Sequence, residues 1–153
     1  MRSGIIATDN KLEKLYSFIQ SYTEFAFDTE TDGLSHDRKW IGLSFAVRTH
    51  ERYLGWYVPT AHERGDDLFS VEPDNANKVW VDKIIDHIFK EGNRVWIQNA
   101  KFDLGVLRNE GYHPEKLRAE VLDTKCVSWL LEPERQCGHG LKALVPAFLG
   151  KEM

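Results

Sequence analysis

Three apolar segments rich in aromatic residues follow one another at short intervals in the first half of the chain, and they constrain the fold more than any other feature. They cover residues 24–30, 40–47 and 53–58, and Pro59 ends the third. Aromatic and β-branched residues favour strands. Because parallel neighbours need a crossover of about a dozen residues or more, the short intervals indicate strands that reverse direction. The sequence therefore predicts an antiparallel meander of three strands.

Helical and strand-like patterns alternate in the rest of the chain. Before the meander, Asn10 and Glu13 form a capping-box pattern that predicts a helix over residues 11–20. After it, we predict helices from Asp74 or Asn75 to about residue 90, over 99–109, over 124–131 and over 140–149, and short strands over 95–97 and 121–122. A meander followed by alternating helices and strands is typical of a mixed α/β sheet, here of five strands, with helices on both faces.

Length and composition limit the class of protein. The 153 residues fit one domain, so we expect a single domain over residues 1–153. No apolar run approaches the roughly 18 residues of a membrane helix, nothing resembles a signal peptide, and two cysteines suit a reducing compartment, so we expect a cytoplasmic protein without a membrane partner. The net charge of -4 argues against coating nucleic acid through bulk positive charge, but it does not exclude an enzyme that holds cations in an acidic cleft.

Asp28 and Glu30 stand two residues apart on the first predicted strand. Side chains at this spacing leave the same face of a sheet, about 6.6 Å apart along the strand. The aromatic residues before them indicate a buried strand, and carboxylates at the end of a buried strand must be paired or bind metal. The pattern allows two interpretations, a metal site or hydrogen bonding to nearby backbone N–H groups.

Asn99 and Asp103 follow the short strand predicted over residues 95–97. Ligands of α/β proteins bind at the carboxyl ends of strands, and i, i+4 spacing places both side chains on one helical face. The alternative is structural: Asn99 caps the helix, and Asp103 complements its dipole. The segment alone favours this structural interpretation.

Taken together, the two segments resemble a known family. Residues 25–34, Phe-Ala-Phe-Asp-Thr-Glu-Thr-Asp-Gly-Leu, resemble the first motif of the DEDD 3′→5′ exonucleases, and residues 99–103, Asn-Ala-Lys-Phe-Asp, resemble the second. Further similarity to the proofreading domain of family A (Pol I-like) DNA polymerases, bacterial or phage, lies in residues 41–47, 57–62, 122–124 and 139–144. The likeness spans about residues 20–150.

The resemblance implies a ribonuclease H-like fold, two Mg²⁺ or Mn²⁺ ions, and proofreading hydrolysis of single-stranded or frayed DNA 3′ ends to nucleoside monophosphates during DNA replication. Two such ions, about 4 Å apart, neutralise the phosphodiester, lower the pKa of a bound water and stabilise the leaving oxygen. Because Mg²⁺ is a hard cation, its protein ligands are mostly carboxylate oxygens.

The resemblance also implies roles for particular residues. Asp28 would bridge both ions, Glu30 would hold the ion on the nucleophile side, and Asp103 would hold the other. These three acids are therefore the expected catalytic and metal-binding residues. The expected substrate-binding residues are Thr31, Leu34, whose side chain matches a wedge against the terminal base, and Asn99.

One departure from the family pattern concerns its third motif, which carries a water-positioning Tyr or His and a fourth carboxylate. That motif lies some tens of residues beyond the segment matching residues 139–144, and the chain ends at Met153. Asp123 corresponds to an acid outside the metal cluster, so it does not replace the fourth carboxylate. Loss of a water-positioning group costs about 10²–10⁴-fold in rate. We therefore expect a split or truncated form, a partner such as a DNA polymerase domain or chain that completes the site, or low activity.

Two rival functions remain. One is an impaired exonuclease-fold module that binds DNA or a polymerase without cutting, and the other is a ribonuclease D-like 3′→5′ exoribonuclease. The spacing of Cys126, Cys137 and His139 does not fit a zinc site. His62 fits an ordinary loop residue better than a residue of the cleft.

Overall fold

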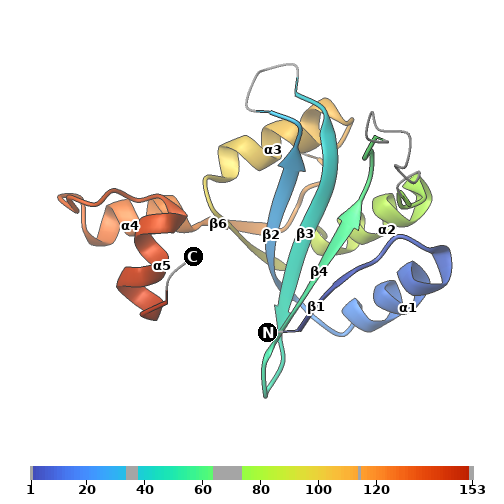
Figure 1. The fold of residues 1–153 in the computed structure, drawn as a ribbon, viewed down its shortest axis with the longest axis horizontal. Coiled ribbons are helices and arrows are strands. Elements are labelled where there is room, and N and C mark those ends of the chain that lie inside the picture. Colours follow the sequence, from blue (N-terminus) through green and yellow to red (C-terminus); the bar gives the residue numbers. More distant parts are fainter. Residues whose placement is uncertain (1, 34–37, 64–73, 114, 152–153) are drawn as a thin grey trace, which may run out of the picture.

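A computed structural model describes residues 2–33, 38–63, 74–113 and 115–151 (Figure 1). Its six-stranded sheet has the order β1-β4-β3-β2-β5-β6. The strands are β1 (Arg2–Ile5), β2 (Glu24–Thr31), β3 (Trp40–Arg48), β4 (Tyr53–Pro59), β5 (Arg94–Ile97) and β6 (Glu120–Asp123). The helices are α1 (Asp9–Ile19), α2 (Lys78–Ile88), α3 (Ala100–Asn109), α4 (Thr124–Leu131) and α5 (Leu141–Leu149).

The sheet is mixed, as the sequence predicts. β2, β3 and β4 form the antiparallel meander, while β5 pairs with β2 and with β6 in parallel. The prediction of five strands was one too few, because β1 adds to the edge of the sheet in parallel with β4. β1 has four residues, one of them Gly4, so it carries too short a pattern for a strand to be recognised from sequence.

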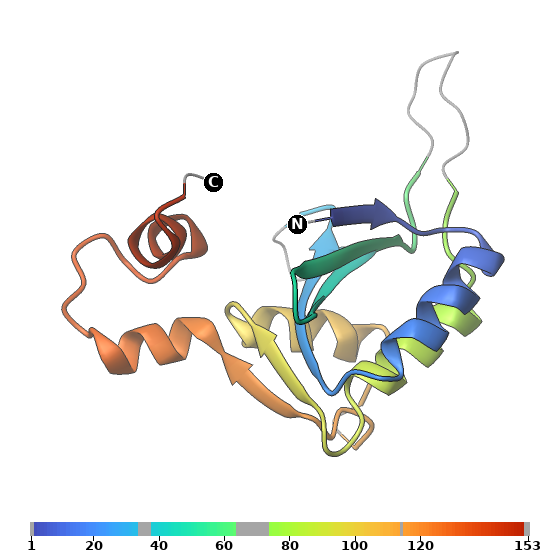
Figure 2. The same cartoon turned by 90° about the horizontal axis from the view of Figure 1, so that it is seen from below.

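Three helices cover one face of the sheet (Figure 2). Along β2 the side chains alternate, and Phe25, Phe27 and Thr29 are the buried ones. The ring of Phe27 packs edge-to-face on Phe89 at the end of α2, and the side chain of Asp103 on α3 reaches Thr29. α5 lies on the other side of the sheet plane, beyond β6 (Figure 2). No helix in the described ranges combines the length and apolar character that crossing a membrane requires.

Two predicted helix starts were wrong in detail. α1 begins after Thr8 rather than at the Asn10–Glu13 pattern, and within the described chain the Thr8 side chain makes no capping hydrogen bond. α2 begins after Asn77, whose side chain accepts from the backbone N–H of Val79, rather than at Asp74 or Asn75. Both starts differ because several polar residues in each segment could cap a helix, and packing selects among them.

Candidate active site

Asp28 and Glu30 project from the face of β2 that the helices leave uncovered. The strand alternates strictly between exposed and buried residues from Glu24 to Glu30. The prediction of a buried strand therefore holds for one face only, since the aromatic residues of β2 pack on that face and its acids occupy the other. Glu30 is paired with Gly42 of β3, and the register shifts immediately after it, between Glu30 and Thr31.

Asp103 comes to the same strand from the first turn of α3. Its side chain is 2% exposed, and its Oδ1 accepts hydrogen bonds from both the backbone N–H and the hydroxyl of Thr29, each at 2.7 Å. Thr29 lies between Asp28 and Glu30, so this contact brings the second motif against the first. Asp103 therefore does more than complement the helix dipole from solvent.

The three carboxyl groups influence one another's charge. Partial burial of the Asp28 carboxyl in the cleft, and then the negative charges of Asp103 and Glu30, raise the pKa of Asp28 to about 6. Burial also raises the pKa of Asp103, although the two hydrogen bonds from Thr29 oppose this change. Carboxylates that repel one another in this way are stabilised in the charged form by a cation.

The chemistry of these side chains suits a hard divalent cation, but their present positions do not form a coordination site. Within the described part of the chain, no three His, Cys, Asp or Glu side chains come close enough together to hold one ion. The donors are carboxylate oxygens, which Mg²⁺ and Mn²⁺ prefer. Asp28 and Glu30 also stand on an exposed strand face, where their side chains have room to turn toward a cation.

Two of the three predicted substrate-binding residues, Thr31 and Asn99, lie in the part of the chain that the structure describes. The hydroxyl of Thr31 donates to the carbonyl of Gly33. Asn99 precedes α3 in the left-handed conformation, with φ of 64°, and its side-chain oxygen accepts from Nζ of Lys125. Leu34 lies outside the described residues, so its predicted role stays a prediction.

Asp123 performs a structural task that our sequence analysis missed. Its carboxylate accepts hydrogen bonds from the backbone N–H groups at the starts of two helices. At the start of α3, the backbone nitrogens of Asn99 and Ala100 lie 3.0 and 2.9 Å from its oxygens. At the start of α4, those of Lys125 and Cys126 lie 2.8 and 3.4 Å away. The helix predicted over residues 124–131 places an Asp at its N-cap, which is the signal that would have revealed half of this arrangement.

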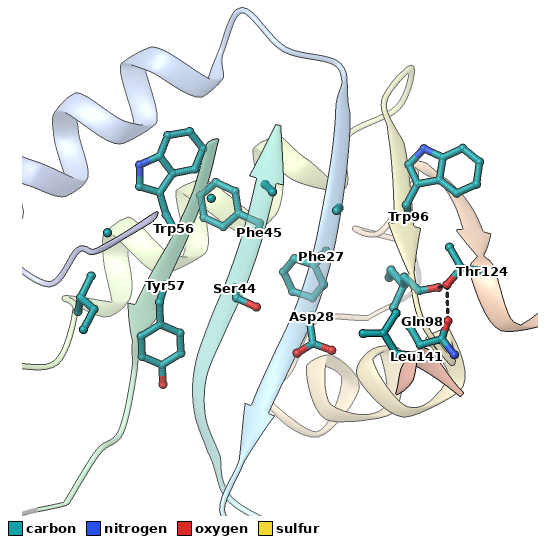
Figure 3. Close-up of a pocket in the computed structure, with 16 residues that line it drawn as sticks. Phe27, Asp28, Ser44, Phe45, Trp56, Tyr57, Trp96, Gln98, Thr124 and Leu141 are labelled. Carbon is teal, nitrogen blue, oxygen red and sulfur yellow. Dashed lines mark hydrogen bonds between the residues drawn. The ribbon is translucent and has the colours of Figure 1, made fainter. Parts of the chain in front are cut away.

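A pocket of about 760 Å³ opens on the uncovered face of the sheet beside Asp28 (Figure 3). Asp28, Ser44 and Tyr57 lie side by side in it, on three neighbouring strands. Trp96 and Gln98 bound it on the β5 side, and Leu141 of α5 also lines it. Asp28 therefore stands at a concave surface that mixes apolar walls with polar groups, as ligand sites do.

Comparison with known proteins assigns the chain to a family. A family model described as 3′-5′ exonuclease matches residues 4–153. The chain belongs to this 3′-5′ exonuclease family. The match covers both acid-bearing segments and nearly the whole described structure, which agrees with the resemblance found in the sequence.

The chain is similar to bacterial DNA polymerases I. It is 30% identical to DNA polymerase I of Synechocystis sp. over 136 residues, which are 85% of this chain and 13% of that protein. It is 26% identical to DNA polymerase I of Treponema pallidum over 149 residues, 80% of this chain and 15% of that protein. The chain therefore spans about one seventh of the length of these relatives.

Solved structures confirm the fold of the chain. Escherichia coli RNase D, described as an exoribonuclease involved in structured RNA processing, matches all of this chain and 35% of its own, with a TM-score of 0.65 and 15% identity. The polymerase domain structure of Pol1 from M. smegmatis, in complex with primer-template DNA, matches 99% of this chain and 23% of its own, with a TM-score of 0.68 and 16% identity. The ribonuclease H-like fold that the sequence implied is thus confirmed.

Proposed function

We propose that this exonuclease domain removes nucleoside monophosphates from the 3′ ends of single-stranded or frayed DNA, with two divalent cations, in the manner of a proofreading domain. The observation that supports this most is the contact of Asp103 with Thr29, which holds three carboxylates around one stretch of β2. The raised pKa of Asp28 supports the same conclusion, because a cation would relieve the repulsion behind it.

The proposal gives each acid a task. Asp28 and Glu30, on the exposed face of β2, would supply oxygen ligands from one side, and Asp103 would supply a carboxylate oxygen from α3. The bound cations would neutralise the phosphodiester and activate water. Thr31, Leu34 and Asn99 border these acids in the sequence, and we propose that they contact the terminal nucleotides.

A degradation assay tests this function. Purified protein with Mn²⁺ and a single DNA strand labelled near its 3′ end is expected to release mononucleotides, and Asp28→Asn is expected to abolish the release. Asp86→Asn, which makes the same change at an exposed acid of α2, is the matched control and should cleave normally. Release of product by Asp28→Asn at the parent rate would contradict the assignment.

RNA is a second candidate substrate, because RNase D shares the fold. The same assay with DNA and RNA strands of equal length and sequence decides between them. Our proposal requires faster release from DNA, and faster release from RNA would replace it with an exoribonuclease.

A non-cutting module is a third candidate, favoured by the absence of a ready coordination site among the described side chains. It predicts metal-dependent DNA binding without release of mononucleotides.

Because the relatives are DNA polymerases I, we propose a polymerase domain, on the same chain or a separate one, as the partner of residues 1–153. Stimulation of mononucleotide release by such a domain would support this pairing, and equal rates with and without it would argue against it.

A further inference from the structure

The hydroxyl of Tyr57 occupies the space beside Glu30 on the uncovered face of the sheet. Glu30 pairs with Gly42 across β2 and β3, and Gly42 has no side chain. A Cβ built on Gly42 would overlap the Tyr57 hydroxyl and would lie only 2.5 Å from its Cζ. Directly opposed side chains of antiparallel strands have Cβ atoms about 5 Å apart. The phenol of Tyr57 thus stands where the cross-strand neighbour of Glu30 would stand.

Contacts on its other side fix this phenol. The Tyr57 hydroxyl hydrogen-bonds Nε2 of His62, and the two rings meet edge-to-face with centroids 5.8 Å apart. His62 is itself held at both backbone groups, since its N–H donates to Asn75 Oδ1 at 2.8 Å and its carbonyl accepts from Asn75 Nδ2 at 2.9 Å. A tyrosine on an ordinary surface needs no such support.

Whether the phenol of Tyr57 has a donor left for the cleft depends on which ring nitrogen of His62 carries the proton. If Nε2 of His62 carries the proton, it donates to the phenol oxygen, and the phenol O–H is free to donate elsewhere. Figure 3 shows the Tyr57 side chain on the same face as that of Asp28, with Ser44 between them. Burial, and then the charge of Glu30, raise the pKa of Tyr57, so the phenol keeps its proton at neutral pH.

We propose that Tyr57 is a positioning residue, whose hydroxyl, held by His62 and seated over Gly42, orients the carboxylate of Glu30 for cation binding. This inference rests on the proposed function, in which Glu30 is a metal ligand. Groups that hydrogen-bond a ligating carboxylate orient it, and their loss costs about 10–100-fold in metal affinity. Tyr57→Phe keeps the ring and removes only the hydroxyl, so it isolates this role.

The approach of the Tyr57 hydroxyl to the Glu30 carboxylate can be measured in the absence of metal and without an activity assay. In protein labelled with ¹³C at glutamate carboxyls, Glu30→Gln identifies the Glu30 resonance. We expect Tyr57→Phe to shift this resonance, and Gly42→Ala to shift it as well, because the added Cβ displaces the hydroxyl. Tyr53→Phe, the same change at a 55% exposed tyrosine of β4, should leave it in place. An unchanged Glu30 resonance in Tyr57→Phe overturns the proposal.

Cation binding then tests the consequence. Mn²⁺ titration followed by electron paramagnetic resonance should show affinity about tenfold weaker in Tyr57→Phe than in the parent. The melting temperature should be preserved. In the cleavage assay, kcat should fall by a larger factor than KM changes. Mn²⁺ affinity within twofold of the parent overturns the positioning role. If the parent itself neither binds Mn²⁺ nor cleaves DNA, the proposed function fails, while the Glu30 resonance still decides whether Tyr57 orients Glu30.

Discussion

At the scale of single residues, the ionisation of Asp28 sets a pH dependence of stability. Burial of its carboxyl, and then the negative charges of Asp103 and Glu30, raise its pKa from 3.8 to about 6. A folded-state pKa above the unfolded value means that the folded protein binds the proton more tightly. The associated stability is therefore complete below about pH 4 and is lost as the pH rises through 6. The negative charge that the proposed cation site requires therefore lowers stability at neutral pH.

We predict that Asp28→Asn makes the protein more stable at pH 7.5 and leaves its stability at pH 4 nearly unchanged, because the amide cannot acquire the repelled charge. Since Asp28 faces solvent, screening reduces the effect to about 1 kcal/mol, or roughly 2–4 °C in melting temperature. Thermal melts of both proteins at the two pH values measure it. Saturating Mg²⁺ should narrow the gap at pH 7.5 by stabilising the parent. A variant that melts below the parent at pH 7.5 without metal would contradict this account.

Asp123 is the other residue whose removal has a defined consequence. Although burial opposes it, hydrogen bonds from the backbone N–H groups of Lys125, Asn99, Ala100 and Cys126 lower the pKa of Asp123. We expect Asp123→Ala to lose about 1–2 kcal/mol of unfolding free energy, the usual cost of a helix cap, and to weaken cleavage because the start of α3 positions Asp103. Urea unfolding and the mononucleotide assay measure the two effects. Asp9→Ala, at an exposed acid in the first turn of α1, is the control. Equal losses of unfolding free energy and cleavage in the two variants would contradict the role of Asp123 in joining the starts of α3 and α4.

At the scale of elements, the sequence predicted the meander, the later strands and all five helices, since each has a clear apolar pattern. α4 was predicted with the bounds that the structure shows, Thr124–Leu131, because Pro133 follows soon after its last residue. β1 was missed because four residues carry no readable period, and its parallel pairing with β4 joins segments about fifty positions apart. The starts of α1 and α2 were misplaced because local signals do not decide among adjacent polar residues.

Only part of the candidate site could be predicted, because some of its contacts join residues far apart in the sequence. Spacing along one strand placed Asp28 and Glu30 on the same face, and the second motif identified Asp103. The hydrogen bonds that Thr29 donates to Asp103 join residues 74 positions apart, so no local pattern predicts them. The approach of Tyr57 to Glu30 depends on the register of three strands and on the missing side chain of Gly42, which only the assembled sheet reveals.

The two C-terminal helices are predicted to be the least stable elements of the fold. Leu144 is the buried residue of α5 and Ser128 that of α4, while Leu130, Leu131 and Leu149 are each at least 65% exposed. In contrast, β2 lies between two paired strands with Phe25 and Phe27 in the core. Elements with few buried contacts open at low free-energy cost. Native-state hydrogen exchange should therefore show amides of α5 exchanging at least 100-fold faster than those of β2, and equal protection would contradict the prediction.

At the scale of the whole molecule, the charge of the chain determines how it can meet DNA. Residues 1–100 carry 12 basic and 16 acidic residues, so the part that holds Asp28 and Glu30 supplies the entire net charge of -4. Such a surface repels phosphates, and non-specific affinity for nucleic acid ordinarily comes from Lys and Arg that neutralise them. Divalent cations between the acids and the phosphates would reverse this repulsion at the site.

We therefore predict that a single DNA strand binds only when a divalent cation is present. Fluorescence anisotropy with a labelled oligothymidylate should show at least tenfold tighter binding in 5 mM Ca²⁺ than in EDTA at equal ionic strength, since Ca²⁺ also takes carboxylate oxygens. Asp28→Asn should remove the Ca²⁺ effect, because it removes a ligand, while Asp86→Asn should retain it. Binding of equal strength in EDTA and Ca²⁺ would mean that the basic residues alone hold DNA, and the carboxylates of β2 would then have no part in substrate binding.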